Sequence, residues 1–434
     1  MVAWATKNGK VAITGGLRTP FVKAGDALKD VHVCDLAALA MRETLYQQSW
    51  PASRLDEVVL GNVVMPADAT NPARVAALYA GVPKQVPAIT VQRNCASGME
   101  AVAYAASRIE SAQARALLAG GAESMSTIPL LFPQEALGAM GRLARAKSLM
   151  RKVLAAAKLR PRHFRPMPAL QMGLTDPTCG LIMGKTAEIL ASEFDISRRQ
   201  QDDYALHSHR KASNAMEEGR LDTQVTTAFV PPKYVPVPRD IGPRPDQSHE
   251  ALAKLKPYFD RRDGTVTVGN ACQVTDGAAV LLVMESQLAR AEGMNVLGYV
   301  RGYATAALDP ARMGLGPVYA IDQLLQKTGM RLDQIGLFEI NEAFAAQVLA
   351  CLKALASDDF ARSRLGRGSA VGELDPAKLN VNGGAIALGH PVGASGARLV
   401  LNLLHEMARR DVEYGIAALC VGGGQGAAML LQRP

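Results

Sequence analysis

Aromatic residues are scarce in this chain of 434 residues: they make up 5% of it, although hydrophobic residues as a whole make up 48%. With 39 glycines and abundant alanine, the core must be filled largely by small side chains and closed by many tight turns. No run of about 18 consecutive apolar residues is present, so we expect no membrane-spanning helix. The first residues lack the basic-then-apolar pattern of a signal peptide, and the last, LLQRP, carry no peroxisomal or lipidation signal. The composition predicts a soluble globular protein of two or three domains.

Cysteine is also rare. The six cysteines follow no regular spacing and form no CxxC pair, which argues against both a disulfide framework and a zinc site. We therefore expect no metal, and a reducing compartment, the cytoplasm, fits best. There a cysteine with a function is more often catalytic than structural. Cys34, Cys179 and Cys351 lie among helical or loop residues and are interpreted as packing thiols.

Acidic residues are missing from one segment. Residues 142–165 contain nine Lys or Arg and no acid, and without them the chain, at +8 overall, is close to neutral. A basic balance confined to one segment is poor evidence for binding nucleic acid. The segment is either a solvated helix face or an amphipathic helix that contacts an anionic membrane or a partner subunit. We favour the second interpretation, because apolar residues would share one side: Leu149, Met150, Val153, Leu154 and Ala157.

Strand-like apolar runs alternate with helical patterns at both ends of the chain, which predicts α/β layers with helices on the faces of a sheet. The predicted strands are 11–14, 57–64, 88–92, 116–124, 379–385 and two within 414–431; the predicted helices are 35–45, 96–112 and 393–410, and 336–355 runs from a strand into a helix.

Two stretches resemble each other. Those starting at Cys95 and Gly393 both run Ala-Ser-Gly, amphipathic helix, apolar strand, glycine cluster, which indicates an internal duplication. The predicted halves are 1–126 with 262–290, and 291–434.

Between the halves, residues 127–261 are rich in Pro and Arg and predict an inserted loop domain. Within it 183–219 is helical, with Asp195 or Ser197 as an N-cap. We expect this domain to lie over the first half as a cap on the substrate.

Cys95 is the first candidate for chemistry. The strand-like AITVQ delivers it to the start of a helix whose N–H groups and dipole favour a thiolate. The following Ala-Ser-Gly is interpreted as clearance for a substrate. The alternative is a small buried hydrophobe.

Two more candidates come from glycine-rich turns. His390 stands between Gly389 and Pro391 in a loop of small residues and could take a proton from a cysteine; alone, it could equally be a surface histidine. Cys420 ends an apolar strand before three glycines, whose N–H groups could hold an anion. No Lys-Ser/Thr follows, so an oxyanion hole beside a second thiol fits better than a phosphate loop.

Asn341 lies where an apolar strand meets a helix, in EINEAFAAQ. The default interpretation is a helix cap. At a sheet end near the other motifs, its amide could instead orient a water or a substrate carbonyl.

Taken together, QRNCASGMEA, GNACQVTDGAA, NEAFAAQ, NGGAIALGHPVGASGAR and CVGGGQGAAM resemble the motif series of the thiolases, most closely the long-chain β-oxidation branch that includes the thiolase subunit of the trifunctional complex. The motifs run in order over nearly the whole chain. The resemblance implies two duplicated βαβαβαββ halves in an αβαβα arrangement with an inserted loop domain.

The resemblance also implies roles. Cys95 would be the acylated nucleophile, His390 the base, and Cys420 the second thiol that shuttles a proton. Asn341 would hold a water that forms one oxyanion hole with His390, and the N–H groups of Cys95 and Gly422 would form the other.

The substrate pocket is expected to involve Met183, Phe344 and Cys272. Cys272 stands where short-chain thiolases have Ser, Ile182 where they have His before the Met, and the long-chain branch usually has His at the position of Asn341. The apolar Ile182 suggests a pocket that tolerates longer acyl chains.

The predicted activity is thiolysis of 3-ketoacyl-CoA, with CoA and acyl-CoA as substrates and no cofactor. The alternative is an acetyl-CoA C-acetyltransferase acting in the biosynthetic direction. A decarboxylating condensing enzyme is disfavoured by Cys420, and a non-catalytic CoA-binding protein by the presence of all the catalytic residue types. From the family we expect a homodimer or tetramer, with an enoyl-CoA hydratase/3-hydroxyacyl-CoA dehydrogenase subunit as a candidate partner.

Overall fold

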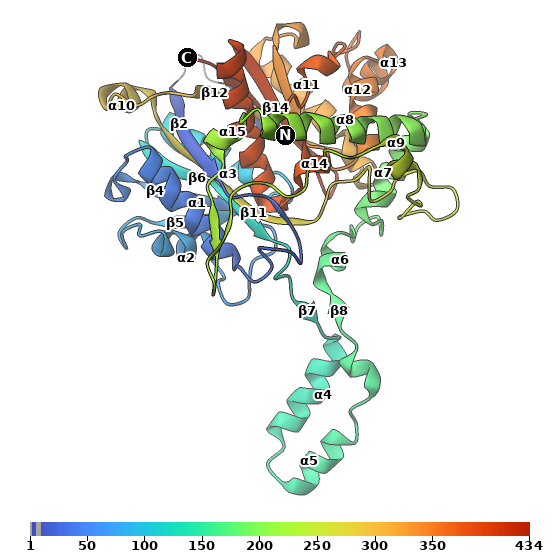
Figure 1. Ribbon diagram of the computed structural model, residues 1–434. Coiled ribbons are helices and arrows are strands. Elements are labelled where there is room, and N and C mark those ends of the chain that lie inside the picture. The colour runs from blue at the N-terminus through green and yellow to red at the C-terminus, as the bar shows by residue number, and fades with distance from the viewer. Residues whose placement is uncertain (1, 6–9) are drawn as a thin grey trace.

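The computed structural model describes residues 2–5 and 10–434. Its central feature is a mixed sheet with the strand order β13-β14-β15-β12-β2-β11-β6-β4-β5, to which β1 and β3 add at β12 and β11 (Figure 1). The strands of this sheet are β1 (Val2–Ala5), β2 (Val11–Arg18), β3 (Val22–Lys23), β4 (Glu57–Gly61), β5 (Ala88–Val91), β6 (Ala116–Ser124), β11 (Thr275–Glu285), β12 (Gly298–Ala307), β13 (Leu337–Ile340), β14 (Tyr414–Val421) and β15 (Gln425–Gln432).

Helices pack on the outer faces of the sheet and between its two ends. They are α1 (Val33–Gln47), α2 (Pro72–Tyr79), α3 (Ser97–Glu110), α4 (Gln134–Arg145), α5 (Leu149–Ala156), α6 (Ala169–Gly173), α7 (Met183–Glu193), α8 (Arg198–Glu217), α9 (His249–Ala253), α10 (Ser286–Ala291), α11 (Gly316–Thr328), α12 (Ala345–Leu355), α13 (Asp358–Phe360), α14 (Ala385–Leu388) and α15 (Val392–Arg410). None of the helices in the described ranges is long and apolar enough to cross a membrane.

The sheet consists of two units with the same topology. In the first, β4 runs parallel to β5 and β6, and β6, β11 and β2 continue antiparallel. In the second, β13 runs parallel to β14, and β14, β15 and β12 continue antiparallel. The units meet where Gly298 and Tyr299 of β12 pair with Ile13 and Ala12 of β2. The repeated order confirms the predicted duplication, whereas the residue ranges predicted for the domains stay predictions.

One predicted strand is wrong. Residues 379–385 would be the counterpart of β5, but only Leu379 forms a bridge to Phe338 of β13. Asn380 and Gly383 have positive φ angles of 44° and 71°, which bend the chain out of an extended strand. The Asn380 side chain replaces the missing backbone pairing, since its Oδ1 accepts from Ile340 N at 2.9 Å and its Nδ2 donates to Ile340 O at 2.8 Å.

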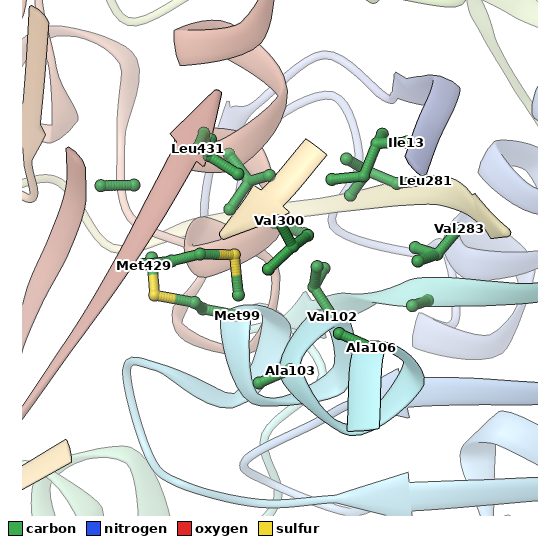
Figure 2. Close-up of a cluster of buried hydrophobic side chains, with 14 of the residues drawn as sticks. Ile13, Met99, Val102, Ala103, Ala106, Leu281, Val283, Val300, Met429 and Leu431 are labelled. Carbon is green, nitrogen blue, oxygen red and sulfur yellow. The ribbon is translucent and has the colours of Figure 1, made fainter. Parts of the chain in front are cut away.

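Three buried clusters define the layers. One lies around α3 and α15 and joins Met99 of α3 to residues of both sheet units, including Ile13, Val300 and Met429 (Figure 2). A second cluster joins α1 and α2 to the first unit, and a third joins α11 and α12 to the second. Helices therefore lie between and outside the sheet units, in the predicted αβαβα arrangement.

The two Ala-Ser-Gly motifs lie where α3 and α15 pack together. A Cβ on Gly98 would lie 2.7 Å from Gly393 O, and one on Gly396 would lie 2.4 Å from Met99 N. The interpretation of Ser97 and Gly98 as clearance for a substrate is therefore wrong. These small residues allow two helix backbones to approach each other.

The inserted segment lies on both halves. Ala228 and Val237 pack on the first half as predicted, where Arg18 of β2 also pairs with Asp240 at 2.6 Å, whereas the helices of the segment lie on the second half. Helix α7 contacts α12, and α8 contacts α12 and α14, because Leu190 and Ile196 join the cluster around α11 and α12. Ser197 is the N-cap of α8 and accepts from Gln200 N. Helices α4 and α5 form a hairpin that projects away from the body, on a stalk made by the strands β7 (Leu130–Leu131) and β8 (Met167–Pro168) (Figure 1).

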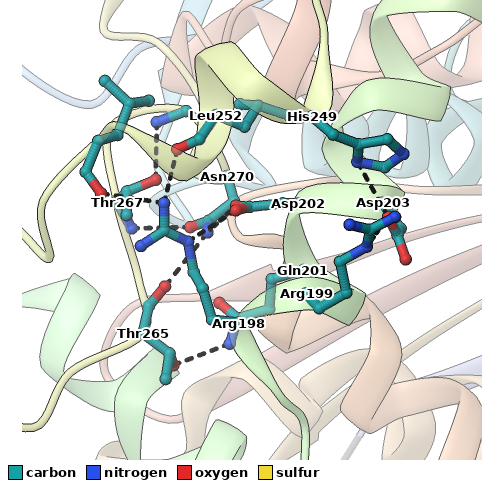
Figure 3. Close-up of polar contacts among 12 residues, drawn as sticks. Arg198, Arg199, Gln201, Asp202, Asp203, His249, Leu252, Thr265, Thr267 and Asn270 are labelled. Carbon is teal, nitrogen blue, oxygen red and sulfur yellow. Dashed lines mark hydrogen bonds and ion pairs between the residues drawn. The ribbon is translucent and has the colours of Figure 1, made fainter.

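A polar network fastens α8 to the segment before Cys272 (Figure 3). Asn270 donates to Asp202 at 2.9 Å and to Thr265 O at 3.2 Å, and Arg198 pairs with Asp202 at 2.8 Å. Asn270 O in turn accepts from Ala345 N at 2.9 Å. The inserted segment thereby helps to hold Cys272 beside the start of α12.

Candidate active site

Cys95 lies in the tight turn between β5 and α3. Asn94 before it has a φ of 41°, a left-handed conformation that Asn adopts more readily than most residues. Ser97 stabilises the turn, since its hydroxyl accepts from Arg93 N at 2.9 Å and donates to Asn94 O at 2.7 Å. The turn presents the partly exposed Cys95 ahead of the helix.

The Cys95 thiol is held in its protonated form. Burial raises its pKa above 9.0, and hydrogen bonds from the backbone of Gly422 and of Cys95 itself only partly oppose this effect. These backbone groups favour the thiolate, but burial outweighs them, and the expected contribution of the helix start stays a prediction. A base is needed to activate the thiol.

The glycine turn after Cys420 lies against the Cys95 turn. Asn94 Nδ2 donates to Gly422 O at 2.8 Å, and Arg93 Nη1 donates to Gln425 Oε1 at 3.0 Å. The next residues, Gly423 and Gly424, have φ angles of 87° and 71°, which favour glycine. These bonds bring Gly422 of the second half to Cys95 of the first.

Cys420 and Cys272 share this region with Cys95. Cys420 is 1% exposed, and burial followed by the charges of Cys95, Cys351 and Cys272 raises its pKa well above 9.0. Burial and the charge of Cys95 raise the pKa of Cys272 to about 12. The structure therefore brings Cys95, Cys272 and Cys420 together as neutral thiols.

His390 is buried and oriented by Ser395. Its Nδ1 lies 2.6 Å from Ser395 Oγ, and that hydroxyl donates to Pro391 O at 3.0 Å. The Ser395 oxygen must then accept a hydrogen bond from Nδ1–H, so we assign the neutral tautomer with its hydrogen on Nδ1, which leaves Nε2 able to take a proton. Burial, with a smaller contribution from Arg398, lowers the pKa of His390 to about 3.

Backbone bonds connect His390 to the thiol region. His390 N donates to Gln273 O at 3.1 Å, and Cys272 N donates to Ala343 O at 3.0 Å. Asn341, two residues before Ala343, places its Nδ2 3.4 Å from His390 Nε2. Its Oδ1 is buried without a hydrogen-bond partner among the described residues.

The predicted pocket residues fall into two groups. Cys272 is partly exposed, and Met183 begins α7 with its sulfur 3.4 Å from where a Cβ on Gly422 would lie. Phe344 is 6% exposed and packs edge-on against Phe259 at 5.9 Å, so it belongs to the core below the site.

Three residues were not predicted. Ser395 was seen only as part of a repeated motif, although its position five residues after His390 was a usable signal. Asn94 and Glu123 carry no local pattern. In the structure Asn94 donates a hydrogen bond to Gly422 O. Glu123 is near enough to Cys95 for its charge to raise the pKa of the thiol.

The duplicated fold and this arrangement of thiols and histidine match a known family. The thiolase N-terminal domain matches residues 11–287 and the thiolase C-terminal domain residues 294–433. The chain belongs to the thiolase family, whose members are acyltransferases.

Several relatives are similar over their full length. A 3-ketoacyl-CoA thiolase of Klebsiella pneumoniae (strain 342) is 39% identical over 429 residues, 98% of each chain. One of Pseudoalteromonas translucida (strain TAC 125) is 39% identical over 98% of this chain and 97% of its own. The Bacillus anthracis acetyl-CoA acetyltransferase superposes with a TM-score of 0.86 at 38% identity, over 98% of this chain and 99% of its own. Human mitochondrial 3-ketoacyl-CoA thiolase in complex with CoA superposes with a TM-score of 0.83 at 35% identity, over 98% of each chain.

Proposed function

We propose that the protein is a 3-ketoacyl-CoA thiolase of fatty-acid β-oxidation, which cleaves 3-ketoacyl-CoA with CoA to acyl-CoA and acetyl-CoA. The observation that carries this proposal is the meeting of two thiols, Cys95 and Cys420, at the Gly422 turn, with a neutral histidine tied to the same region. Full-length similarity to proteins named 3-ketoacyl-CoA thiolase supports it.

In the first step His390 Nε2 takes the proton of Cys95, and the thiolate attacks the C3 carbonyl of the substrate. The C2–C3 bond then breaks, and its electron pair leaves as the enolate of acetyl-CoA. Cys420 protonates this enolate and becomes a thiolate. The acyl-enzyme therefore holds a protonated His390 and an ionised Cys420, whose opposite charges offset part of the cost of burying each one alone.

In the second step Cys420 takes the proton of an incoming CoA thiol, which attacks the acyl group on Cys95. Cys95 leaves as a thiolate and recovers its proton from His390, so the enzyme returns to its starting state. The N–H groups of Cys95 and Gly422 would stabilise one oxyanion, and a water held by Asn341 with His390 the other; one such donor typically contributes about 10²–10³ in rate. No cofactor is required.

The test is to incubate the protein with CoA and either acetoacetyl-CoA or 3-ketohexadecanoyl-CoA and to follow loss of the Mg²⁺-enolate absorbance. Turnover of the long substrate supports the β-oxidation role. Turnover of acetoacetyl-CoA alone favours the acetyl-CoA C-acetyltransferase alternative. Inactivity with both, without an acyl adduct on Cys95, would contradict either function.

The variant Cys420→Ser separates the two steps. A serine hydroxyl is too weak an acid to shuttle the proton, so we expect Cys95 still to be acylated by activated acyl donors while turnover falls about 10²-fold or more. Mass spectrometry of the intact protein measures the adduct. A matched control is Cys34→Ser, remote in the α1 core; full turnover by Cys420→Ser would overturn the shuttle role.

We further propose that the basic hairpin, residues 134–165, lies on an anionic membrane surface. Helix α5, every residue of which is described, contains no buried residue. Leu149, Met150, Val153 and Leu154 are 80%, 77%, 60% and 58% exposed, beside nine Lys or Arg between 142 and 165 and no acid. Apolar residues flanked by cations suit insertion among anionic headgroups.

For assembly and location we propose a homodimer or tetramer in the cytoplasm, with a hydratase/dehydrogenase subunit as a candidate partner. The family resemblance supports the assembly, and six free cysteines support a reducing compartment. Light scattering of the purified protein tests the assembly.

A further inference from the structure

Glu123 is a buried carboxylate at the end of β6 that the proposed reaction does not use. It is 1% exposed. One oxygen accepts from Asn62 Nδ2 at 3.1 Å and Val64 N at 3.0 Å, and the other from Val63 N and Gly393 N, both at 3.0 Å. All four donors are uncharged N–H groups, and among residues 2–5 and 10–434 the carboxylate has no ion pair.

These donors come from both halves of the molecule. Asn62, Val63 and Val64 follow β4 of the first half, whereas Gly393 lies in the first turn of α15 in the second. A Cβ on Gly393 would lie 2.8 Å from Glu123 Oε2 and 2.5 Å from Ala122 O. The start of α15 is therefore seated directly on the end of β6.

This turn also carries the proposed base. Gly393 is three residues after His390 and two before Ser395, which orients the imidazole. Cys95 is also near, close enough for the charge of Glu123 to raise its pKa. Glu123 thus binds the segment that bears the base and lies near the nucleophile.

We propose that Glu123 is a positioning residue whose ionised carboxylate aligns His390 with Cys95 by fastening the first turn of α15 to β6 and to residues 62–64. Only the ionised form offers acceptors to all four N–H groups. A protonated carboxyl presents an O–H to one of the donors and loses that contact. This proposal rests on the thiolase function proposed above.

The alignment should depend on pH. Burial raises the pKa of Glu123 to about 7, against the effect of its hydrogen bonds. Other titratable groups on the elements packed around it are Cys95 before α3, Asp276 on β11, and His390 and Arg398 in the α15 segment. The pKa of Cys95 is raised above 9.0 and that of His390 is lowered to about 3, so neither titrates near 7. Turnover should fall as the pH drops through about 7.

The test compares kcat against pH for the wild type, Glu123→Gln and Asn62→Ala. Gln points an amide N–H₂ at N–H donors, so we expect kcat to fall about 10²-fold, as for a small misplacement of reacting groups, with KM for CoA little changed and no loss of rate near pH 7. Asn62→Ala removes a hydrogen bond to the ionised Glu123 carboxylate and so raises its pKa. The fall in kcat should therefore occur at a higher pH than in the wild type.

Glu339→Gln is the matched control, because Glu339 is a second buried carboxylate whose pKa burial raises to about 7. The Glu339→Gln variant should lose kcat at the same pH as the wild type. The proposal is overturned if Glu123→Gln keeps the wild-type kcat and pH profile. It is also overturned if Asn62→Ala leaves the pH of half-maximal kcat unchanged while Glu339→Gln abolishes the fall in kcat. Should Glu123→Gln fail to fold, the Asn62→Ala profile decides. An inactive wild type would instead contradict the proposed function.

Discussion

At the residue scale, the chemistry depends on which nitrogen of His390 carries the proton. The Ser395 hydroxyl donates a hydrogen bond to Pro391 O and must accept one from His390 Nδ1–H. Nε2, which faces Asn341, is left as the proton acceptor. Before the reaction His390 is neutral, because burial lowers its pKa to about 3, so its tautomer decides whether it can act as a base.

Ser395→Ala should therefore impair turnover more than stability. Without the hydroxyl, Nδ1 loses its acceptor and the ring can take the other tautomer, so we expect kcat to fall about 10²-fold, within the range for general-base catalysis. Stopped-flow acylation of Cys95 measures the step. Ser111→Ala, an exposed serine at the end of α3, is the control. Wild-type acylation by Ser395→Ala would show that the tautomer is fixed in some other way.

The sequence motifs identified the residues that meet at the site but not what holds them. Cys95, His390 and Cys420 each follow a recognisable strand or glycine pattern. Asn94 and Glu123 act through partners some 270 to 330 positions away, Gly393 and Gly422, which a local pattern does not reveal. Ser97 and Gly98 were misinterpreted for the same reason, since their partner is α15.

At the scale of elements, the basic hairpin contributes little to the hydrophobic core, since α5 has no buried residue. Its apolar side chains on α5 are exposed, and residues 142–165 carry basic charges and no acid, so we expect the hairpin to contribute to binding and not to folding. Local amphipathic spacing predicted a helix with Leu149, Met150, Val153 and Leu154 on one side, and α5 contains these residues, although the basic segment is divided between the end of α4 and α5. In contrast, the strand at 379–385 was mispredicted because the Asn380 side chain replaces backbone pairing.

Arg151→Glu with Lys152→Glu tests the hairpin. Each basic residue near an anionic surface contributes about 1 kcal/mol, so reversing two should weaken binding to vesicles containing an anionic phospholipid at least about tenfold, without changing turnover. Vesicle co-sedimentation measures this, with neutral phosphatidylcholine vesicles for comparison. Lys84→Glu with Lys327→Glu makes the same charge change on exposed residues outside the hairpin. Equal vesicle binding by both double variants, or by a chain lacking 142–160, contradicts the membrane proposal; capture of a partner subunit without vesicle binding would replace it.

At the scale of the whole molecule, duplication places the two halves of the site on separate sheet units. The Asn94–Gly422, Arg93–Gln425 and Glu123–Gly393 contacts all cross between them. The fold could be predicted from strand and helix order because both halves repeat it. The buried charges at the junction could not, since Glu123 in the sequence looks like any residue at the end of a strand.

These buried charges separate the pH of greatest stability from the pH of greatest activity. Burial raises the pKa of Glu123 and Glu339 from 4.5 to about 7, so their contribution to stability is present below 4.5 and is lost as the pH rises through 7, by up to about 3 kcal/mol each. His209 and His390, with pKa values lowered from 6.5 to about 4 and about 3, contribute stability above 6.5 that is lost as the pH falls below it.

We therefore expect the melting temperature to be highest near pH 6 to 6.5 and roughly 2 °C lower at pH 8, whereas turnover, which needs ionised Glu123, rises over the same interval. Near-UV circular dichroism melts and initial rates in the same buffers measure the two trends. In Glu123→Gln one of the two titrating carboxylates is gone, so the difference in melting temperature between pH 6.5 and 8 should shrink by about half. A wild-type melting temperature that rises from pH 6.5 to 8 would mean that these carboxylates are already ionised in the folded protein, and the loss of activity near pH 7 would then need another titrating group.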